Sequence, residues 1–138
     1  MPQHITTLTV STRGKALVEI TSEVAAWVAG TGVDTGLLTL FCRHTSASLL
    51  ITENAAPAVK RDLLRWLDRL APESADYEHD DEGPDDMPAH LRAALTGNSL
   101  SIPVTGGRMV LGTWQGVHLA EHRAIPHQRQ IVAHLLSA

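Results

Sequence analysis

The chain has 138 residues, 43% hydrophobic and 19% charged, a composition typical of one folded domain spanning residues 1–138 and not of a disordered chain. Eleven Lys and Arg against fifteen Asp and Glu give a net charge of −4 without a basic patch, which excludes nucleic acid as an expected partner. The apolar runs are too short to cross a membrane, and the lack of a signal peptide and of a disulfide pair leads us to expect a cytoplasmic protein.

The first third of the chain predicts four strands and one short helix. Two runs rich in Thr, Val, Ile and Leu flank Arg13-Gly14, a pattern that predicts a β-hairpin. A capped helix follows, and the third strand is apolar on both faces, which predicts that both faces are covered. In chain order the expected elements are strands His4–Thr12 and Lys15–Ile20, helix Glu23–Ala29, and strands Gly36–His44 and Ala47–Glu53.

The middle of the chain predicts two helices separated by an acidic loop. Apolar residues recur at helical spacing over Ala58–Leu70, and Pro57 suits the first turn of that helix. The periodicity then stops, and eight of the fifteen acids lie between Glu73 and His90. A long loop such as Ala71–Asp86 inside a small domain is usually functional or disordered. A short helix over Pro88–Leu95 should follow, capped by Asp85 or Asp86.

Four further strands close the chain, the first two joined by a Gly106-Gly107 turn. They are expected over Ser99–Val104, Arg108–Thr113, Val117–His122 and Gln130–Leu136. About eight strands and three helices in separate blocks predict a compact α+β domain with a mostly antiparallel, β-sandwich-like core.

Imidazoles from three separate segments suggest a metal site. His44 lies in a turn rich in hydroxyl groups, His90 ends the acidic run, and His122 ends a strand. His118 is excluded from the same site, because residues four apart on a strand lie about 13 Å apart, and it is interpreted as an ordinary strand histidine. Zinc-like ions take imidazole nitrogen and Mg²⁺ takes carboxylate oxygen, so His44, His90 and His122 are the predicted ligands of a divalent metal ion. Cys42 is interpreted as a core residue.

Several motifs along the chain resemble those of one family. They are His44-Thr45-Ser46-Ala47-Ser48-Leu49, Glu53-Asn54-Ala55, the run from Glu82-Gly83-Pro84 to His90, Gly97-Asn98-Ser99-Leu100, Leu111-Gly112-Thr113-Trp114-Gln115-Gly116, and Glu121-His122-Arg123. On these residues the chain resembles the YjbQ family, also designated UPF0047 and labelled secondary thiamine-phosphate synthase. The resemblance covers nearly the whole chain and is weakest over the first forty residues.

The resemblance implies a compact α+β fold, assembly as a homotrimer, and a metal-binding pocket near subunit boundaries. On this basis Asp86 is a candidate oxygen ligand or partner of a ligating histidine, and Glu121 is a candidate acid/base. Arg108 and Arg123 would bind phosphate together with Ser46 and Ser48. The pocket would also contain Asn54, Trp114 and Gln115.

The activity that the resemblance implies is the joining of a pyrimidine-methyl diphosphate to a thiazole phosphate, with release of diphosphate. A divalent metal and guanidinium groups would stabilise the leaving anion. Two alternatives stay open: a metal-dependent hydrolase of phosphate esters, and a non-enzymatic trimer that binds a metal or a small ligand.

Overall fold

The computed structural model describes residues 2–138 and contains eight strands and three helices among them. The helices are α1 (Thr21–Gly30), α2 (Pro57–Leu70) and α3 (Asp86–Thr96). The strands are β1 (Gln3–Thr12), β2 (Ala16–Glu19), β3 (Gly36–Cys42), β4 (Ala47–Glu53), β5 (Ser99–Thr105), β6 (Arg108–Met109), β7 (Gln115–Glu121) and β8 (His127–Ser137).

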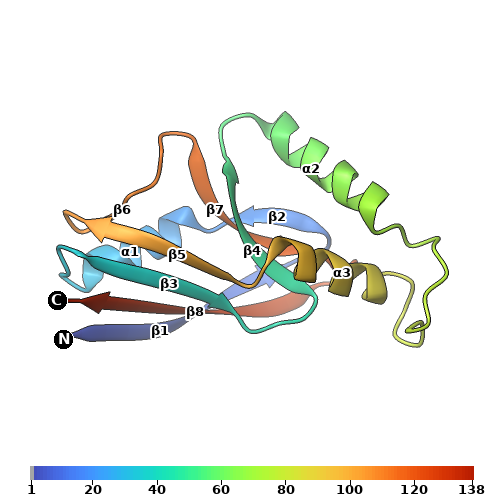
Figure 1. The fold of residues 1–138 in the computed structure, drawn as a ribbon, viewed down its shortest axis with the longest axis horizontal. Coiled ribbons are helices and arrows are strands. Elements are labelled where there is room, and N and C mark those ends of the chain that lie inside the picture. Colours follow the sequence, from blue (N-terminus) through green and yellow to red (C-terminus); the bar gives the residue numbers. More distant parts are fainter. Residues whose placement is uncertain (1) are drawn as a thin grey trace.

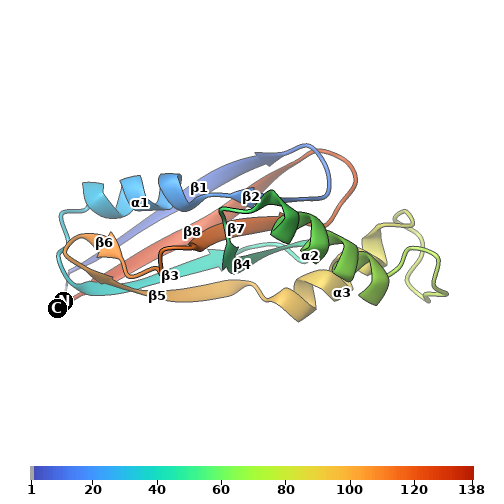
Figure 2. The same ribbon diagram turned by 90° about the horizontal axis from the view of Figure 1, so that it is seen from above.

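The strands form two antiparallel sheets, so the predicted α+β sandwich is confirmed. A five-stranded sheet has the order β1-β8-β3-β5-β6, and a three-stranded sheet has the order β2-β7-β4. Figures 1 and 2 show the smaller sheet lying over the larger one, with both termini at one end and the α2–α3 connection at the other. None of the helices in residues 2–138 is long and apolar enough to span a membrane.

The core lies between the two sheets and includes the inner side of α1. Leu38, Leu40 and Cys42 share the inner face of β3, as predicted. The prediction that both faces of this strand are covered is wrong within one chain, because Leu37 and Phe41 on the outer face are 45% and 43% exposed. Val117 and Leu119 of β7 face them from the smaller sheet, and Val24 of α1 is fully buried among them. Cys42 is 1% exposed and is therefore a core residue.

The predicted hairpin between the first two strands is wrong. β1 pairs with β8 in the large sheet, whereas β2 pairs with β7 in the small sheet. The turn at Arg13-Gly14 therefore carries the chain from one sheet to the other. Alternation of apolar residues specifies which face of a strand is buried, but it does not specify the neighbouring strand.

The other predicted elements differ from the observed ones mainly at their ends. The strand expected over Arg108–Thr113 is only Arg108–Met109, because the chain then leaves the sheet into an exposed loop. The turn before it is confirmed as a hairpin, with φ of 60° at Gly106 and 73° at Gly107. The acidic segment before Asp86 contains no helix or strand, as predicted.

Asp85 occupies the position before α3, but its side chain makes no capping hydrogen bond. Its Oδ2 instead accepts hydrogen bonds from Arg123 Nε at 2.9 Å and from the backbone N–H of Ala124 at 2.8 Å. The predicted capping role of Asp85 is therefore wrong, because its carboxylate is held by an ion pair with the end of β7. This contact fixes the acidic loop to the sandwich.

Candidate metal centre

The acidic loop and the first turn of α3 bring two imidazoles onto one carboxylate. Asp86 Oδ2 lies 2.9 Å from His79 Nε2 and 3.1 Å from His90 Nε2. His79 comes from the loop, while Asp86 and His90 are one turn apart on α3, so the helix places both on the same face. Their nitrogen and oxygen atoms all lie within 4.8 Å of one another. These three residues are called the His–Asp–His cluster below.

The hydrogen bond on the far side of His90 determines what its Nε2 can do. Nδ1 of His90 lies 3.0 Å from the carbonyl oxygen of Thr45, and because a carbonyl can only accept, Nδ1 carries the hydrogen. In neutral His90 the Nε2 lone pair then points at the Asp86 carboxylate. Two facing acceptors repel unless a proton or a cation lies between them. This arrangement of a backbone-bonded imidazole is common among metal-ligating histidines.

A cation bound here would displace a proton from His79 and would meet an ionised Asp86. Hydrogen bonding to Asp86 raises the pKa of His79 above its ordinary value. Burial opposes ionisation of Asp86, which is 3% exposed. Contacts with His79, His90 and Arg123 nevertheless hold the pKa of Asp86 below its usual range. Two imidazoles and one ionised carboxylate form a donor set that suits zinc-like divalent ions, so the residues present fit a metal.

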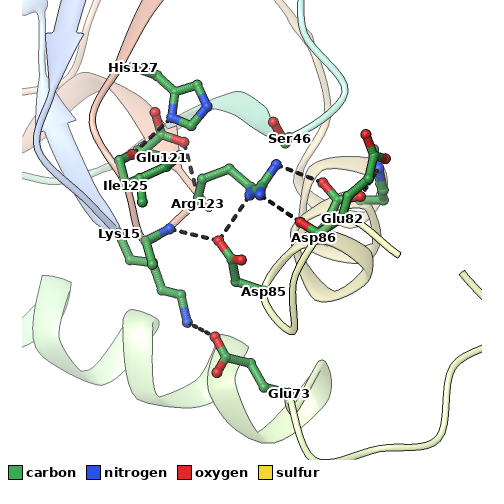
Figure 3. Close-up of polar contacts among 12 residues, drawn as sticks. Lys15, Ser46, Glu73, Glu82, Asp85, Asp86, Glu121, Arg123, Ile125 and His127 are labelled. Carbon is green, nitrogen blue, oxygen red and sulfur yellow. Dashed lines mark hydrogen bonds and ion pairs between the residues drawn. The ribbon is translucent and has the colours of Figure 1, made fainter. Parts of the chain in front are cut away.

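Arg123 fastens the acidic loop next to this cluster. Its Nε donates to Asp85, its Nη1 donates to Asp86 Oδ1 at 2.8 Å, and its Nη2 donates to the carbonyl of Glu82 at 3.1 Å. Figure 3 shows the guanidinium group between these three partners. The side chain predicted to bind phosphate therefore binds the loop, and a phosphate role for Arg123 stays a prediction.

The structure does not gather the three predicted histidines in one chain. Within residues 2–138, no group of three such donors within 4.8 Å of one another includes His44 or His122. Nε2 of His44 accepts the backbone N–H of Gln130 at 2.8 Å. Burial lowers the pKa of His122 to about 4, so this side chain is neutral at pH 7, and its Nε2 lies 2.8 Å from Ser48 Oγ. Of the three predicted histidines, only His90 lies in the cluster.

His44 and His90 nevertheless share a cavity. A cleft of about 300 Å³ lies between the β3–β4 turn and α3. It is lined by His44, Thr45, Ala47, His90, Ala93, Ala94 and Asn98. A space of this volume is at the small end of the range of ligand pockets in proteins. The two histidines therefore lie beside the same cavity, although only His90 reaches the His–Asp–His cluster.

The two predicted phosphate-binding serines have protein partners. Ser48 is fully buried, and its Oγ lies 2.6 Å from Thr96 Oγ1 as well as within reach of His122. Ser46 is 8% exposed, and its Oγ accepts a hydrogen bond from Arg129 at 3.0 Å. Ser48 would have to exchange a contact to bind phosphate, whereas Ser46 only accepts a hydrogen bond and keeps its own O–H free to donate. The phosphate role of both serines stays a prediction.

Glu121 points into the sandwich, on the inner face that the alternation of β7 predicts. Its carboxylate accepts hydrogen bonds from Arg129, from Thr12 Oγ1 at 2.6 Å and from the backbone N–H of Arg123 at 3.1 Å. Burial alone would raise the pKa of Glu121, yet these donors, led by Arg129, hold it below its ordinary value. The contacts of Glu121 are structural, and its predicted acid/base role stays a prediction.

Four predicted pocket or phosphate residues lie away from the cluster within one chain. Arg108 is in β6, which Figures 1 and 2 place at the end of the molecule opposite α3. Gln115 begins β7 and pairs with Glu53, about 20 Å along the strand from Glu121. Trp114 precedes it and is 62% exposed, and Asn54 accompanies them, since its N–H donates to the Trp114 carbonyl.

The sequence analysis does not predict two residues that make polar contacts near the site, His79 and Arg129. His79 lies in the acidic run, but no local pattern relates it to α3. Arg129 carries a readable signal, because it alternates with the buried residues Ile131 and Ala133 on the inner face of β8. An arginine on an otherwise apolar strand face indicates a buried carboxylate partner, and that partner is Glu121.

The fold is a two-sheet antiparallel sandwich, and histidine and carboxylate side chains on the acidic loop and α3 form a candidate cation centre beside it. A family model described as UPF0047 protein YjbQ-like matches residues 6–138. The chain therefore belongs to the YjbQ (UPF0047) family.

Relatives in other organisms match over almost their whole length. A UPF0047 protein of Synechocystis is 52% identical over 134 residues, which cover 96% of this chain and 91% of that protein. The YjbQ protein of Salmonella typhimurium is 45% identical over 130 residues, covering 94% of each chain.

Solved structures share the fold. A conserved hypothetical protein from Thermus thermophilus is 39% identical and superposes with a TM-score of 0.85, covering 95% of this chain and 99% of that one. An uncharacterized conserved protein of the yjbq/upf0047 family from Clostridium acetobutylicum is 34% identical, with a TM-score of 0.88 and the same coverage.

Proposed function

We propose that this protein is a metal-dependent enzyme that acts on a small phosphorylated molecule, with a divalent cation bound by the His–Asp–His cluster. The observation that carries the proposal is the convergence of His79 Nε2 and His90 Nε2 on one oxygen of Asp86. The proposal keeps His90 and Asp86 from the residues predicted by sequence and adds His79. A zinc-like ion suits this donor set better than Mg²⁺, which prefers oxygen ligands.

The reaction we propose is the one that the family resemblance implies. The carbon–oxygen bond between a pyrimidine-methyl group and diphosphate breaks, and diphosphate leaves with the bonding electron pair. The ring nitrogen of a thiazole phosphate then forms the new carbon–nitrogen bond. A bound divalent cation supplies charge stabilisation to the departing anion. His79, Asp86 and His90 would hold the cation, and the His79 side chain is 43% exposed, so this side of the cluster faces solvent.

A hydrolase is the second candidate, and one contact favours it. Glu82 Oε2 lies 3.2 Å from His79 Nε2, and the Glu82 side chain is 63% exposed. An exposed carboxylate beside a cation site can accept a proton from an attacking water. Hydrolysis of a phosphate ester would need no second organic substrate.

Metal analysis tests the cation centre. Protein purified without chelator or added metal is analysed for bound ions, and Zn²⁺, Mn²⁺ and Mg²⁺ are titrated into metal-free protein by calorimetry. We expect H79A and H90A to bind Zn²⁺ at least 10-fold more weakly than the wild type. H4A should keep the wild-type affinity, because His4 lies near the start of β1, at the end of the molecule opposite the acidic loop (Figure 1). If both H79A and H90A bind Zn²⁺ with the wild-type affinity, the proposed metal centre is wrong.

Activity assays separate the candidate reactions. The protein is incubated with the pyrimidine-methyl diphosphate and the thiazole phosphate, and thiamine phosphate is detected by fluorescence. A panel of generic phosphate esters tests the hydrolase. Silence in both assays by a protein that holds its metal would favour a binding protein over either enzyme.

We also propose assembly as a homotrimer, which the family resemblance implies. The outer face of the five-stranded sheet supports contact with another chain, because Ile5, Leu37 and Phe41 are 69%, 45% and 43% exposed there. Arg108 and Trp114 lie far from the His–Asp–His cluster of their own chain. In a trimer they could lie near the His–Asp–His cluster of a neighbouring chain.

A further inference from the structure

Arg123 divides the two oxygens of Asp86 between different partners. Oδ1 accepts the guanidinium Nη1 at 2.8 Å, while Oδ2 faces the two imidazoles. A carboxylate held at one oxygen by a planar guanidinium group cannot rotate freely about its last bond. The oxygen that Arg123 leaves free is the one on which His79 and His90 converge.

The guanidinium group is itself fixed on several sides. Asp85 accepts its Nε, the carbonyl of Glu82 accepts its Nη2, and the backbone N–H of Arg123 is bound by the buried carboxylate of Glu121. The side chain of Arg123 is only 17% exposed. The backbone of Arg123 is therefore bound to a buried carboxylate and its side chain to Asp86, so one residue connects the interior of the sandwich to the cluster.

We propose that Arg123 is a positioning residue that orients Asp86 for the divalent cation, an inference that rests on the proposed function. Among the described residues the guanidinium group bonds to Asp85, Asp86 and Glu82 and to neither imidazole, so it acts through the Asp86 carboxylate. This assignment differs from the phosphate-binding role that the sequence suggests for the same residue.

Electrostatics and positioning predict opposite signs for the loss of Arg123. Removing a positive charge beside a cation site relieves repulsion, so by charge alone R123Q would bind a divalent cation more tightly than the wild type. If Arg123 orients Asp86, R123Q binds more weakly, by about 10- to 100-fold as for other residues that orient metal ligands. R123K keeps the charge but loses the planar fork, so positioning predicts weaker binding for it as well.

The experiment titrates Co²⁺ into metal-free wild type, R123Q, R123K and R65Q, with affinity measured by calorimetry and the ligand field by visible absorption. Arg65 is an exposed residue of α2 that pairs with Asp62, so R65Q is the matched control for loss of one positive charge. Amide NMR spectra of the metal-free proteins show whether each variant is folded. We expect R123Q and R123K to lose affinity and to change the absorption bands, while R65Q matches the wild type.

Each outcome bears on a different statement. Tighter binding by R123Q, or affinity and absorption equal to those of the wild type in a folded R123K, overturns the positioning role while the cation centre stands. Failure of the wild type to bind Co²⁺ overturns the cation centre, and this inference with it. A folded R123Q with weakened binding and altered absorption supports both.

Discussion

Glu121 and Arg129 form an ion pair inside the sandwich, where the two side chains are 0% and 4% exposed. A buried pair contributes little net stability compared with apolar residues, but removing one partner leaves an unpaired charge away from water. At this position Thr12 and Ser46 add hydrogen bonds to the pair. Glu121 lies on the inner face of β7 and Arg129 on the inner face of β8. Their ion pair explains why the fold tolerates these two buried charges.

We expect E121Q or R129M alone to lower the free energy of unfolding by about 3–5 kcal/mol, because each leaves the other charge buried and unpaired. The double variant E121L/R129M should recover most of this loss. Urea unfolding at one fixed protein concentration measures all three. Equal losses in the single variants and the double variant would contradict the explanation by an unpaired charge.

His122 is a buried neutral histidine, and its environment makes stability depend on pH. Its pKa is lowered from 6.5 to about 4 in the folded protein, chiefly by burial. Between pH 6.5 and pH 4 the unfolded chain therefore binds a proton at His122 that the folded protein does not bind. Stability is fully present above pH 6.5 and falls as the pH drops, by about 3 kcal/mol in total for this residue.

Replacing His122 should flatten this part of the pH profile. We expect the free energy of unfolding of H122Q to change less between pH 7 and pH 4.5 than that of the wild type, although H122Q is less stable at pH 7. Urea unfolding at four pH values measures the difference. Other groups with shifted pKa values affect both proteins equally, so identical slopes would show that His122 is not the titrating group.

At the scale of elements, the apolar face of α2 is only partly buried against the rest of the chain. Helical spacing predicts that Val59, Leu63, Leu67 and Leu70 face the body of the protein. Leu67 is 2% exposed, but Leu70 is 52% exposed. The C-terminal end of α2 is held by Arg92 of α3, whose Nη2 donates to the carbonyl of Ala71 at 2.9 Å.

Two leucines of α2 should therefore respond differently to truncation. L67A is expected to lower the free energy of unfolding by about 2–5 kcal/mol because it leaves a cavity under the helix. L70A should change it by no more than about 0.5 kcal/mol in a single chain. Urea unfolding compares the two. A large loss in L70A would indicate that this exposed leucine is covered by another molecule in solution.

At the scale of the whole molecule, the proposed homotrimer is tested by the molecular mass in solution. Light scattering coupled to size-exclusion chromatography should give a mass of about three times the 14.9 kDa of one chain. Apolar side chains exposed on the large sheet should be buried in the assembly, so the double variant L37D/F41D should reduce the mass by introducing charges there. A wild-type protein of 14.9 kDa would exclude the trimer.

The sequence by itself determined the features that depend on local spacing. Alternation placed Leu38, Leu40 and Cys42 on one face of a strand, and helical spacing predicted α2. These predictions succeed because strand and helix periodicities fix relative directions over a few residues.

Only the tertiary structure decided which distant segments meet. Strand alternation is the same whichever strand lies alongside, so the separation of β1 and β2 into different sheets was not readable. In the same way, His79 reaches Asp86 because the acidic loop closes around Arg123, whereas His122 is held by Ser48 under α3. Such contacts depend on the path of the whole chain through space, and residue spacing carries no measure of that path.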